Sequence, residues 1–166
     1  YIVKPFTSAT LKEKLDKKVV LAGSWQEAAG HPDVDLVIVS TTNDALVPVS
    51  LFALEKGKHV LVEKPAARSA AEIKTLLKAA KRSKKKVKVG FNHRFHPALL
   101  KAKELVDSGA VGELMFIRGR YGHGGRIGYE KEWRADPAVS GGGELLDQGV
   151  PLIALARWFL GDFTRV

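Results

Sequence analysis

Three short polar clusters in this sequence carry side chains that could bind a ligand or take part in catalysis. They are Thr41-Thr42-Asn43-Asp44, Glu63-Lys64-Pro65 and Asn92-His93-Arg94. Each cluster directly follows a short run of apolar and β-branched residues, which is typical of a strand. For any one cluster, turn chemistry is an alternative explanation, because Thr, Asn and Pro favour turns. Three such clusters after three successive strands favour a shared ligand site.

Lys64 is the strongest candidate for a catalytic role among these side chains. A lysine at the end of a strand beside an apolar sheet can be partly desolvated, and such a lysine is a plausible proton donor or acceptor. The proline at position 65 restricts Lys64 to extended backbone geometry. The alternative is a surface lysine paired with Glu63. We therefore predict an acid–base role for Lys64 and leave the surface pair as the competing interpretation.

The elements that must position these clusters alternate along the chain. The sequence predicts strands at 19–21, 36–40, 59–62 and 87–90, and helices at 45–56, 69–82 and 97–108. Helix starts are indicated by the capping-box patterns at 10–13, 24–27 and 69–72, and helix ends by Gly57 and Gly109. Alternating strands and helices predict an α/β fold, here a partial Rossmann-like doubly wound parallel sheet.

The topology determines where the three clusters lie. We expect the strands ending at Ser40, Val62 and Gly90 to be parallel neighbours, with helices 45–56 and 69–82 as their right-handed crossovers. The nearly continuous apolar character of the first two of these strands suits coverage on both faces of the sheet. In an open parallel sheet, ligands bind outside the carboxyl ends of the strands. The sequence therefore predicts that the clusters face one crevice.

The regular alternation of predicted strands and helices ends near residues 111 and 112, and we place a domain boundary there. Beyond it the sequence predicts a strand at 113–121, a glycine-rich loop at 122–128, a second loop at 135–143 and an apolar helix at 152–160. These elements are too few to close a sheet of their own. We expect two units, 1–111 and 112–166, the second being the start of an α/β (α+β) domain.

Composition narrows the classes of protein and partner. The 166 residues are 45% hydrophobic and 27% charged, as in an ordinary globular protein. The absence of Cys excludes disulfides and thiolate sites and suits a reducing cytoplasm. No apolar run approaches the roughly 18 residues of a membrane span. The net charge of +9 includes seven basic residues between Lys78 and Lys88, which we interpret as a solvated helix end. Without interleaved aromatic residues, a nucleic-acid partner is not expected, and no metal site is predicted.

Three segments resemble the Gfo/Idh/MocA family of NAD(P)-dependent sugar and cyclitol oxidoreductases. They are 59–65 (HVLVEKP), 90–95 (GFNHRF) and 140–149 (SGGGELLDQG), and the resemblance runs from about Ser24 to the C-terminus. It implies that 1–111 is a dinucleotide-binding Rossmann-like domain and 112–166 a substrate and oligomerisation domain. It also implies NAD or NADP as cofactor, a sugar or cyclitol as substrate, and a homo-oligomer. The implied reaction moves a hydride between the cofactor and a hydroxyl-bearing carbon.

The resemblance also implies a role for each matched position. Lys64 and Asp147 would be catalytic. Cofactor contacts are implied for Thr41, Thr42, Asn43, Glu63, Lys64, Pro65, Asn92 and Arg94. Residues that would line the substrate pocket are Tyr121, Arg126, Tyr129, Trp133 and Arg134.

The chain departs from the family pattern at three polar positions. The second motif of the family continues from its Asp to an acid–base His and a further Asp, where this sequence has Pro151 and Ala154, and Leu46 occupies another position that is often His. Proline cannot titrate, and inside a helix it costs about 3 kcal/mol. If the helix instead begins at Pro151, that cost vanishes but Asp147 lies in a loop.

A further departure is that no Gly-x-Gly-x-x-Gly turn precedes Val19. Because that turn binds the pyrophosphate, the sequence predicts weak binding of NAD(P) and has the character of a truncated member of the family. Two hypotheses follow. One is an oxidoreductase whose catalysis is impaired, and the other is a non-catalytic relative, a redesigned scaffold or a binding module of the same fold.

Overall fold

The computed structural model describes residues 19–122 and 127–165. The predicted helix start at 10–13 and the candidate residue Arg126 lie outside the described residues. Three parallel strands form one sheet in the order β1-β2-β3, comprising β1 (Leu36–Val39), β2 (His59–Glu63) and β3 (Val87–Gly90). Val39 pairs with Val62, and Glu63 with Gly90. The predicted parallel neighbours are confirmed.

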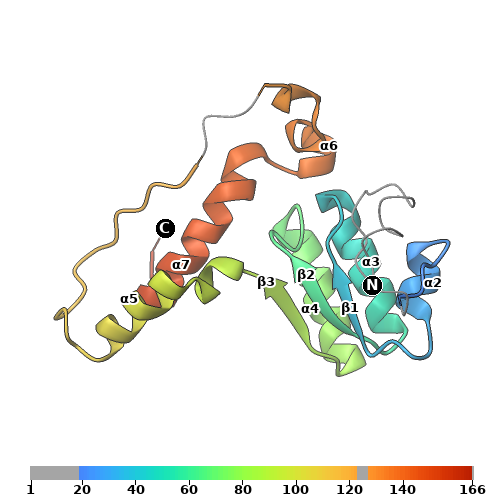
Figure 1. Ribbon diagram of the computed structural model, residues 1–166, viewed down its shortest axis with the longest axis horizontal. Helices are drawn as coiled ribbons and strands as arrows, with labels where there is room; N and C mark the ends of the chain where they lie inside the picture. Colours follow the sequence, from blue (N-terminus) through green and yellow to red (C-terminus); the bar gives the residue numbers. More distant parts are fainter. Residues whose placement is uncertain (1–18, 123–126, 166) are drawn as a thin grey trace.

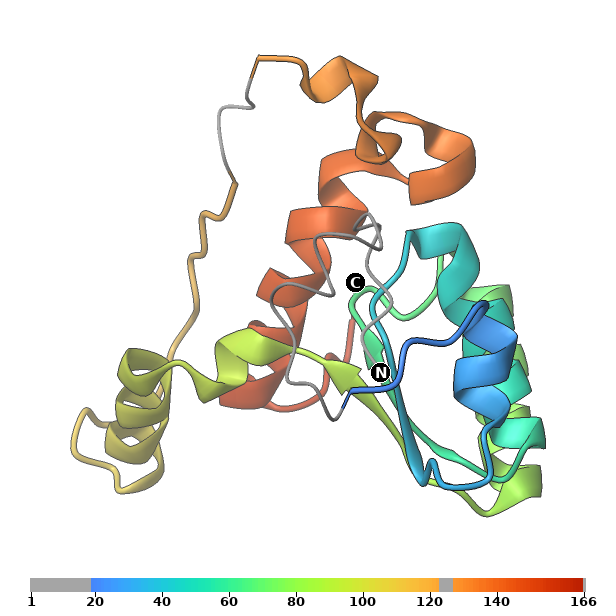
Figure 2. The ribbon, with the colours of Figure 1, turned by 45° about the vertical axis from the view of Figure 1, so that its right-hand side comes forward.

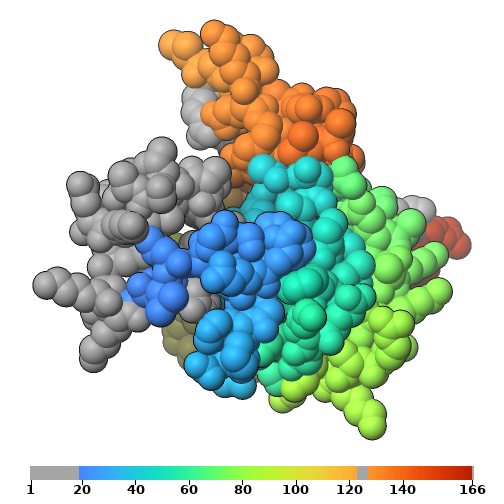
Figure 3. Space-filling view, turned by 90° about the vertical axis from the view of Figure 1, so that its right-hand side faces the viewer, coloured from blue at the N-terminus to red at the C-terminus, as the bar shows by residue number. Residues whose placement is uncertain are grey.

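Helices α3 (Asn43–Glu55) and α4 (Ala70–Ser83) are the two crossovers, as predicted, and α2 (Trp25–Gly30) precedes β1. All three helices lie side by side on one face of the sheet (Figures 1 and 3). Two consecutive right-handed crossovers in one direction across a sheet place both helices on the same face. The capping serines are confirmed, since Ser24 Oγ accepts from the Glu27 N–H (3.2 Å) and Ser69 Oγ from the Glu72 N–H (3.3 Å).

The core lies between the sheet and this helix layer. Val39, Val60 and Val62 are almost completely buried and pack with Leu46 and Leu54 of α3. Leu46 has no exposed surface, so an apolar side chain at this position fills the core.

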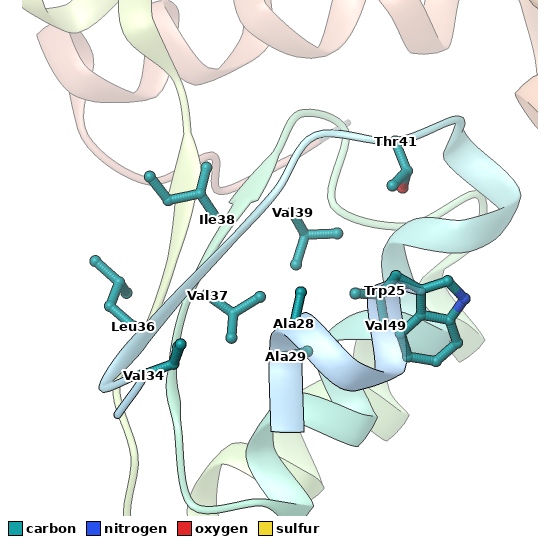
Figure 4. Close-up of a pocket in the computed structure, with 10 residues that line it drawn as sticks. All are labelled: Trp25, Ala28, Ala29, Val34, Leu36, Val37, Ile38, Val39, Thr41 and Val49. Atoms are coloured by element: carbon teal, nitrogen blue, oxygen red, sulfur yellow. The ribbon is translucent and has the colours of Figure 1, made fainter. Parts of the chain in front are cut away.

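The opposite face of the sheet is more open than the sequence predicts. Val37 and Val39 point toward α2, whereas Leu36 and Ile38 point to the other side of β1 (Figure 4), where 48% and 36% of their surface is exposed. Among the described residues, helices α2 to α4 cover only one face of the strands. The strand predicted at 19–21 is also wrong, because these residues have no strand partner in the described part of the chain.

Beyond β3 come the 3₁₀ turn η1 (Asn92–Phe95) and α5 (Pro97–Asp107), the latter confirming the helix predicted at 97–108. The strand predicted at 113–121 does not form. This segment is extended, but the described residues offer it no neighbouring strand, and Met115 and Phe116 are 91% and 74% exposed. Figure 2 shows it leading away from the sheet.

The rest of the chain is a series of helical turns. Turns η2 (Tyr129–Lys131) and η3 (Trp133–Ala135) lead to α6 (Pro137–Ser140), followed by a π-helical turn, η4 (Leu145–Gly149), and α7 (Val150–Leu160). The helix predicted at 152–160 is confirmed and begins two residues earlier. In the described part of the chain, no helix is long and apolar enough to cross a membrane.

Candidate active site

The three polar clusters lie at one edge of the sheet, because the strands that precede them are parallel neighbours. Thr42 is the N-cap of α3, Lys64 follows β2, and Arg94 lies in η1 after β3. The Lys64–Pro65 peptide bond is cis. Pro65, Ala66 and Ala67 are buried, whereas Glu63 is exposed.

Lys64 makes the central contact of the site. Its Nζ donates to the main-chain oxygen of Asp147 (2.8 Å) and forms an ion pair with Oδ1 of the same residue. The two side chains are 26% and 18% exposed. A partly buried pair is screened less than a surface pair, so this contact holds the ammonium in place. It also joins the sheet to a residue 83 positions away in the chain.

The second carboxylate oxygen of Asp147 faces other polar groups. Gln148 Nε2 donates to Oδ2 (3.3 Å), and Arg134 Nε lies 4.0 Å from it. The Arg134 guanidinium lies 4.4 Å from the ring centre of Trp133. Partial burial raises the pKa of Tyr129, and the carboxylates of Glu144 and Asp147 raise it further. The structure thus brings two of the predicted substrate-pocket residues, Tyr129 and Arg134, close to Asp147, and a third, Trp133, lies against Arg134.

Two more contacts hold the loop before Asp147 against the sheet edge. The buried Asn43 donates from Nδ2 to the carbonyl of Ser140 (2.8 Å), and Arg68 donates to the carbonyl of Ala138 (2.6 Å). Gly141 adopts a φ of +86°, and a Cβ there would come within 2.5 Å of Arg68 Cβ. Glycine at 141 therefore allows the loop to approach the Arg68 backbone closely.

Arg68 is itself held by the capping box of α4. Its guanidinium and its backbone N–H both donate to the carboxylate of Glu72 (2.8 Å each). Burial acts to raise the pKa of Glu72, but these hydrogen bonds outweigh it and lower the pKa below its ordinary value. The hydrogen bond to Glu72 raises the pKa of Arg68. The carboxylate thus fixes the side chain that meets Ala138.

Asp147 lies in a helical turn, not in a loop. The turn η4 runs directly into α7, and Gly149 and Val150 both have right-handed helical geometry. Pro151 is buried at the second position of α7, and because η4 precedes it without a break, its missing N–H falls inside a continuous helical run. The Val150 N–H donates to the carbonyl of Leu145, five residues back, which widens the helix at this point.

Several other predicted site residues form hydrogen bonds within the protein. Arg94 donates to the carbonyl of Ala154 in α7 (2.9 Å), and its guanidinium lies about 6 Å from the rings of Phe91 and Trp158. Tyr121 Oη lies 3.1 Å from His93 Nε2. Thr41 Oγ1 donates to the carbonyl of Thr42, and Asn92 is exposed.

An apolar pocket beside β1 lies on the α2 side of the sheet (Figure 4). Trp25, Val37 and Val49 contribute to its lining, and its free volume is about 10 Å³. This is the space of a single water molecule, so the pocket is a packing gap and not a ligand site. No group of three or more His, Asp or Glu side chains suited to a metal occurs in the described ranges.

Arg68, Ser140 and Gln148 belong to the site but did not stand out in the sequence. Arg68 carries one signal, an acidic partner four residues later in the α4 capping box. Ser140 contributes its main-chain carbonyl, and because every residue has one, the residue type gives no indication of this contact.

Comparisons with known proteins identify the family of this chain. Residues 3–91 match the family model described as "Oxidoreductase family, NAD-binding Rossmann fold", and residues 99–166 match "GFO/IDH/MocA C-terminal domain". Levoglucosan dehydrogenase from Pseudarthrobacter phenanthrenivorans is 32% identical over 86% of this chain, and inositol 2-dehydrogenase from Salmonella typhimurium is 32% identical over 64%. The chain spans 37% and 33% of the lengths of these two relatives.

A solved structure of levoglucosan dehydrogenase in complex with NADH and levoglucosan is also similar. Its TM-score is 0.79 at 31% identity, covering 86% of this chain and 39% of the other.

Proposed function

The chain belongs to the GFO/IDH/MocA oxidoreductase family, with an NAD-binding Rossmann fold, and we propose that it transfers a hydride between NAD or NADP and a sugar or cyclitol hydroxyl group. The contact between Lys64 and Asp147 carries this proposal, because it places a proton-bearing cation at the carboxyl edge of the sheet. The similarity to proteins named levoglucosan dehydrogenase and inositol 2-dehydrogenase supports the substrate class.

The residues at this edge fit a dinucleotide. Ser140 Oγ and Arg68 Nε are buried polar atoms without a hydrogen-bond partner among the described residues. Buried polar groups are normally satisfied, so both are available to a polar ligand. We propose that the cofactor is held by the strand-end clusters, namely Thr41, Thr42, Asn43, Glu63, Lys64, Pro65, Asn92 and Arg94.

When bound, the nicotinamide supplies or accepts the hydride. Lys64 Nζ then gives a proton to the substrate carbonyl oxygen during reduction, and takes it from the hydroxyl during oxidation. Asp147 holds the ammonium through two oxygens, while Gln148 and Arg134 fix the orientation of its carboxylate. Tyr121, Tyr129, Trp133 and Arg134 form the proposed wall of the substrate pocket.

We further propose that turnover is slow. Pro151 occupies the position of the acid–base His in the family pattern and cannot carry a proton. Ala154 occupies the position of the second Asp, and here it contributes only its carbonyl, to Arg94. The same observations favour a second candidate function, a non-catalytic protein that binds the dinucleotide or a sugar.

The test combines binding with turnover. NADH and NADPH fluorescence titrations on the 166-residue chain are followed by a screen of levoglucosan and inositol at saturating cofactor. We expect weak cofactor binding with slow turnover, and we expect Pro151→His to raise kcat, since a general acid–base contributes about 10²–10⁴-fold.

The control variants separate the two functions. Lys64→Met should abolish turnover, whereas Lys101→Met removes an exposed lysine on α5 and should not. Turnover that survives Lys64→Met would contradict the catalytic assignment. Binding without any turnover, in both the wild type and Pro151→His, would favour the non-catalytic protein.

The remaining assignments are part of the same proposal. We place the boundary between the two units at residues 111 and 112, and we propose a homo-oligomer in the cytoplasm. The exposed apolar side chains of 113–121, such as Met115 and Phe116, support association with another chain. The location rests on composition alone.

A further inference from the structure

The main-chain carbonyl of Asp147 is available for an unusual reason. In a regular α-helix, this carbonyl would accept from the N–H of residue 151, four positions later. That residue is Pro151, which has no N–H. Lys64 Nζ instead donates to the same carbonyl oxygen, at 2.8 Å. A side chain from the sheet edge thus donates to a carbonyl that residue 151 cannot serve as a backbone donor.

The local geometry turns this carbonyl out of the regular helical pattern. In η4 the Val150 N–H bonds to the carbonyl of Leu145, so the backbone is wider here than in an α-helix. The ring of a helical proline also crowds the carbonyl four residues before it. Each feature favours an Asp147 carbonyl that points away from the helix axis.

We propose that Pro151 is a positioning residue that reserves the Asp147 carbonyl for the Lys64 ammonium. Two acceptors on one residue, the carbonyl and Oδ1, then fix Nζ more tightly than the carboxylate alone. This inference deepens the proposed function, since Lys64 is its proton-carrying group. The assignment gives the proline at 151 a role of its own in the site. The net gain expected from Pro151→His is therefore the 10²–10⁴-fold contribution of an acid–base His, reduced by about tenfold for the lost positioning of Lys64.

The test is Pro151→Ala, which restores an N–H that competes for the Asp147 carbonyl. The readout is the hydrogen-exchange rate of the Lys64 ammonium protons in ¹⁵N NMR spectra of the 166-residue chain at low temperature. The Lys64 signal is identified by its loss in Lys64→Met. We expect exchange to become about tenfold faster, as the loss of one hydrogen bond to a charged group predicts. No cofactor is needed, so the result does not depend on turnover.

Two controls are built into the chain. Lys58 is buried and donates to the carbonyls of His31 (2.7 Å) and Pro32 (3.4 Å), so its signal is an internal reference that should not change. Pro48 is an exposed proline inside α3, and Pro48→Ala also restores a helical N–H. That variant should leave Lys64 exchange unaltered.

A second variant keeps the inference testable if the helix rearranges. Asp147→Asn removes the carboxylate charge but keeps the main-chain carbonyl. In this single variant the Lys64 ammonium protons should stay partly protected from exchange. In the Asp147→Asn/Pro151→Ala double variant they should lose that protection. Unchanged exchange in Pro151→Ala, or equal exchange in the Asp147→Asn variants with and without Pro151, would overturn the inference. Absent turnover with the expected exchange pattern would instead count against the proposed function alone.

Discussion

The two regions of this molecule are held together in different ways. In the sheet region, 36–95, valines of all three strands and leucines of α3 and α4 share one apolar core. In the helical region, 127–160, only Ser140, Pro151 and Ala154 are buried among the described residues. The first region carries its own hydrophobic stabilisation. The second depends on the first for its position.

Four hydrogen bonds between the regions have one common form. A side chain of the first region donates to a main-chain carbonyl of the second: Asn43 to Ser140, Lys64 to Asp147, Arg68 to Ala138 and Arg94 to Ala154. Each such bond contributes about 1 kcal/mol, or 1.5–3 kcal/mol when the donor is charged. The core and this set of bonds should therefore respond to different mutations.

The largest effect is expected in the core. Leu46→Ala removes a fully buried side chain and should lower the free energy of unfolding by about 2–5 kcal/mol, measured by denaturant or thermal unfolding. The matched variant in the second region is Leu145→Ala, since Leu145 is 75% exposed, and its effect should stay within about 0.5 kcal/mol. Equal losses in the two variants would contradict the distinction between the regions.

A smaller and more local effect is expected at Gly141. Gly141→Ala and Gly143→Ala both place a side chain at positive φ, which costs about 1–2 kcal/mol, but only at 141 would the new Cβ meet Arg68. We expect Gly141→Ala to cost about 1–3 kcal/mol more. It should also speed amide hydrogen exchange in 136–150 while leaving β1 to β3 protected. If the two variants behave alike, the close approach to Arg68 does not hold the loop.

The smallest effect is a pH dependence at Arg68. The pKa of Glu72 is lowered in the folded state, so its contribution is present above its unfolded value of about 4.5 and is lost as the pH falls through the lowered pKa. Acid should therefore loosen 136–150, by less than about 1 kcal/mol. Glu72→Gln should remove this dependence in amide-exchange measurements, whereas Glu104→Gln on the exposed α5 pair should keep it. The same acid response in Glu72→Gln would assign it to another carboxylate.

The strands and crossovers of the first region are predictable from the sequence because their signals are local, whereas the open face of the sheet is not. Alternating apolar runs, capping serines and the glycine after α3 predict β1 to β3 and their crossovers, and the polar clusters at the strand ends follow from the parallel order. The strand at 113–121 was predicted from apolar content alone, but a strand needs a partner, and the described residues provide none.

The contacts of the site were harder to predict. Lys64 was selected by its place after a strand and Asp147 by the family resemblance, and nothing in the sequence indicates that the two pair across 83 positions. The partners of Asn43, Arg68 and Arg94 are main-chain carbonyls, which every residue possesses. The position of Arg94 against α7 therefore leaves no pattern in the sequence. No sequence pattern predicts the π-helical turn at Leu145–Gly149 either.

Recognition of carbonyl oxygens also affects how this scaffold could be diversified. A change of side chain at the exposed Ala138 leaves its acceptor in place, whereas the donors Asn43, Lys64, Arg68 and Arg94 cannot be exchanged so freely. A library could vary Tyr129, Trp133 and the residues around them while the four donors are kept constant. Its members would have different side chains around the proposed substrate pocket and the same hydrogen bonds between the two regions. Transplanting the same segment from a relative should need a matching backbone path together with Gly141 and the Asp147 carboxylate, so the second region is the interchangeable part of the molecule.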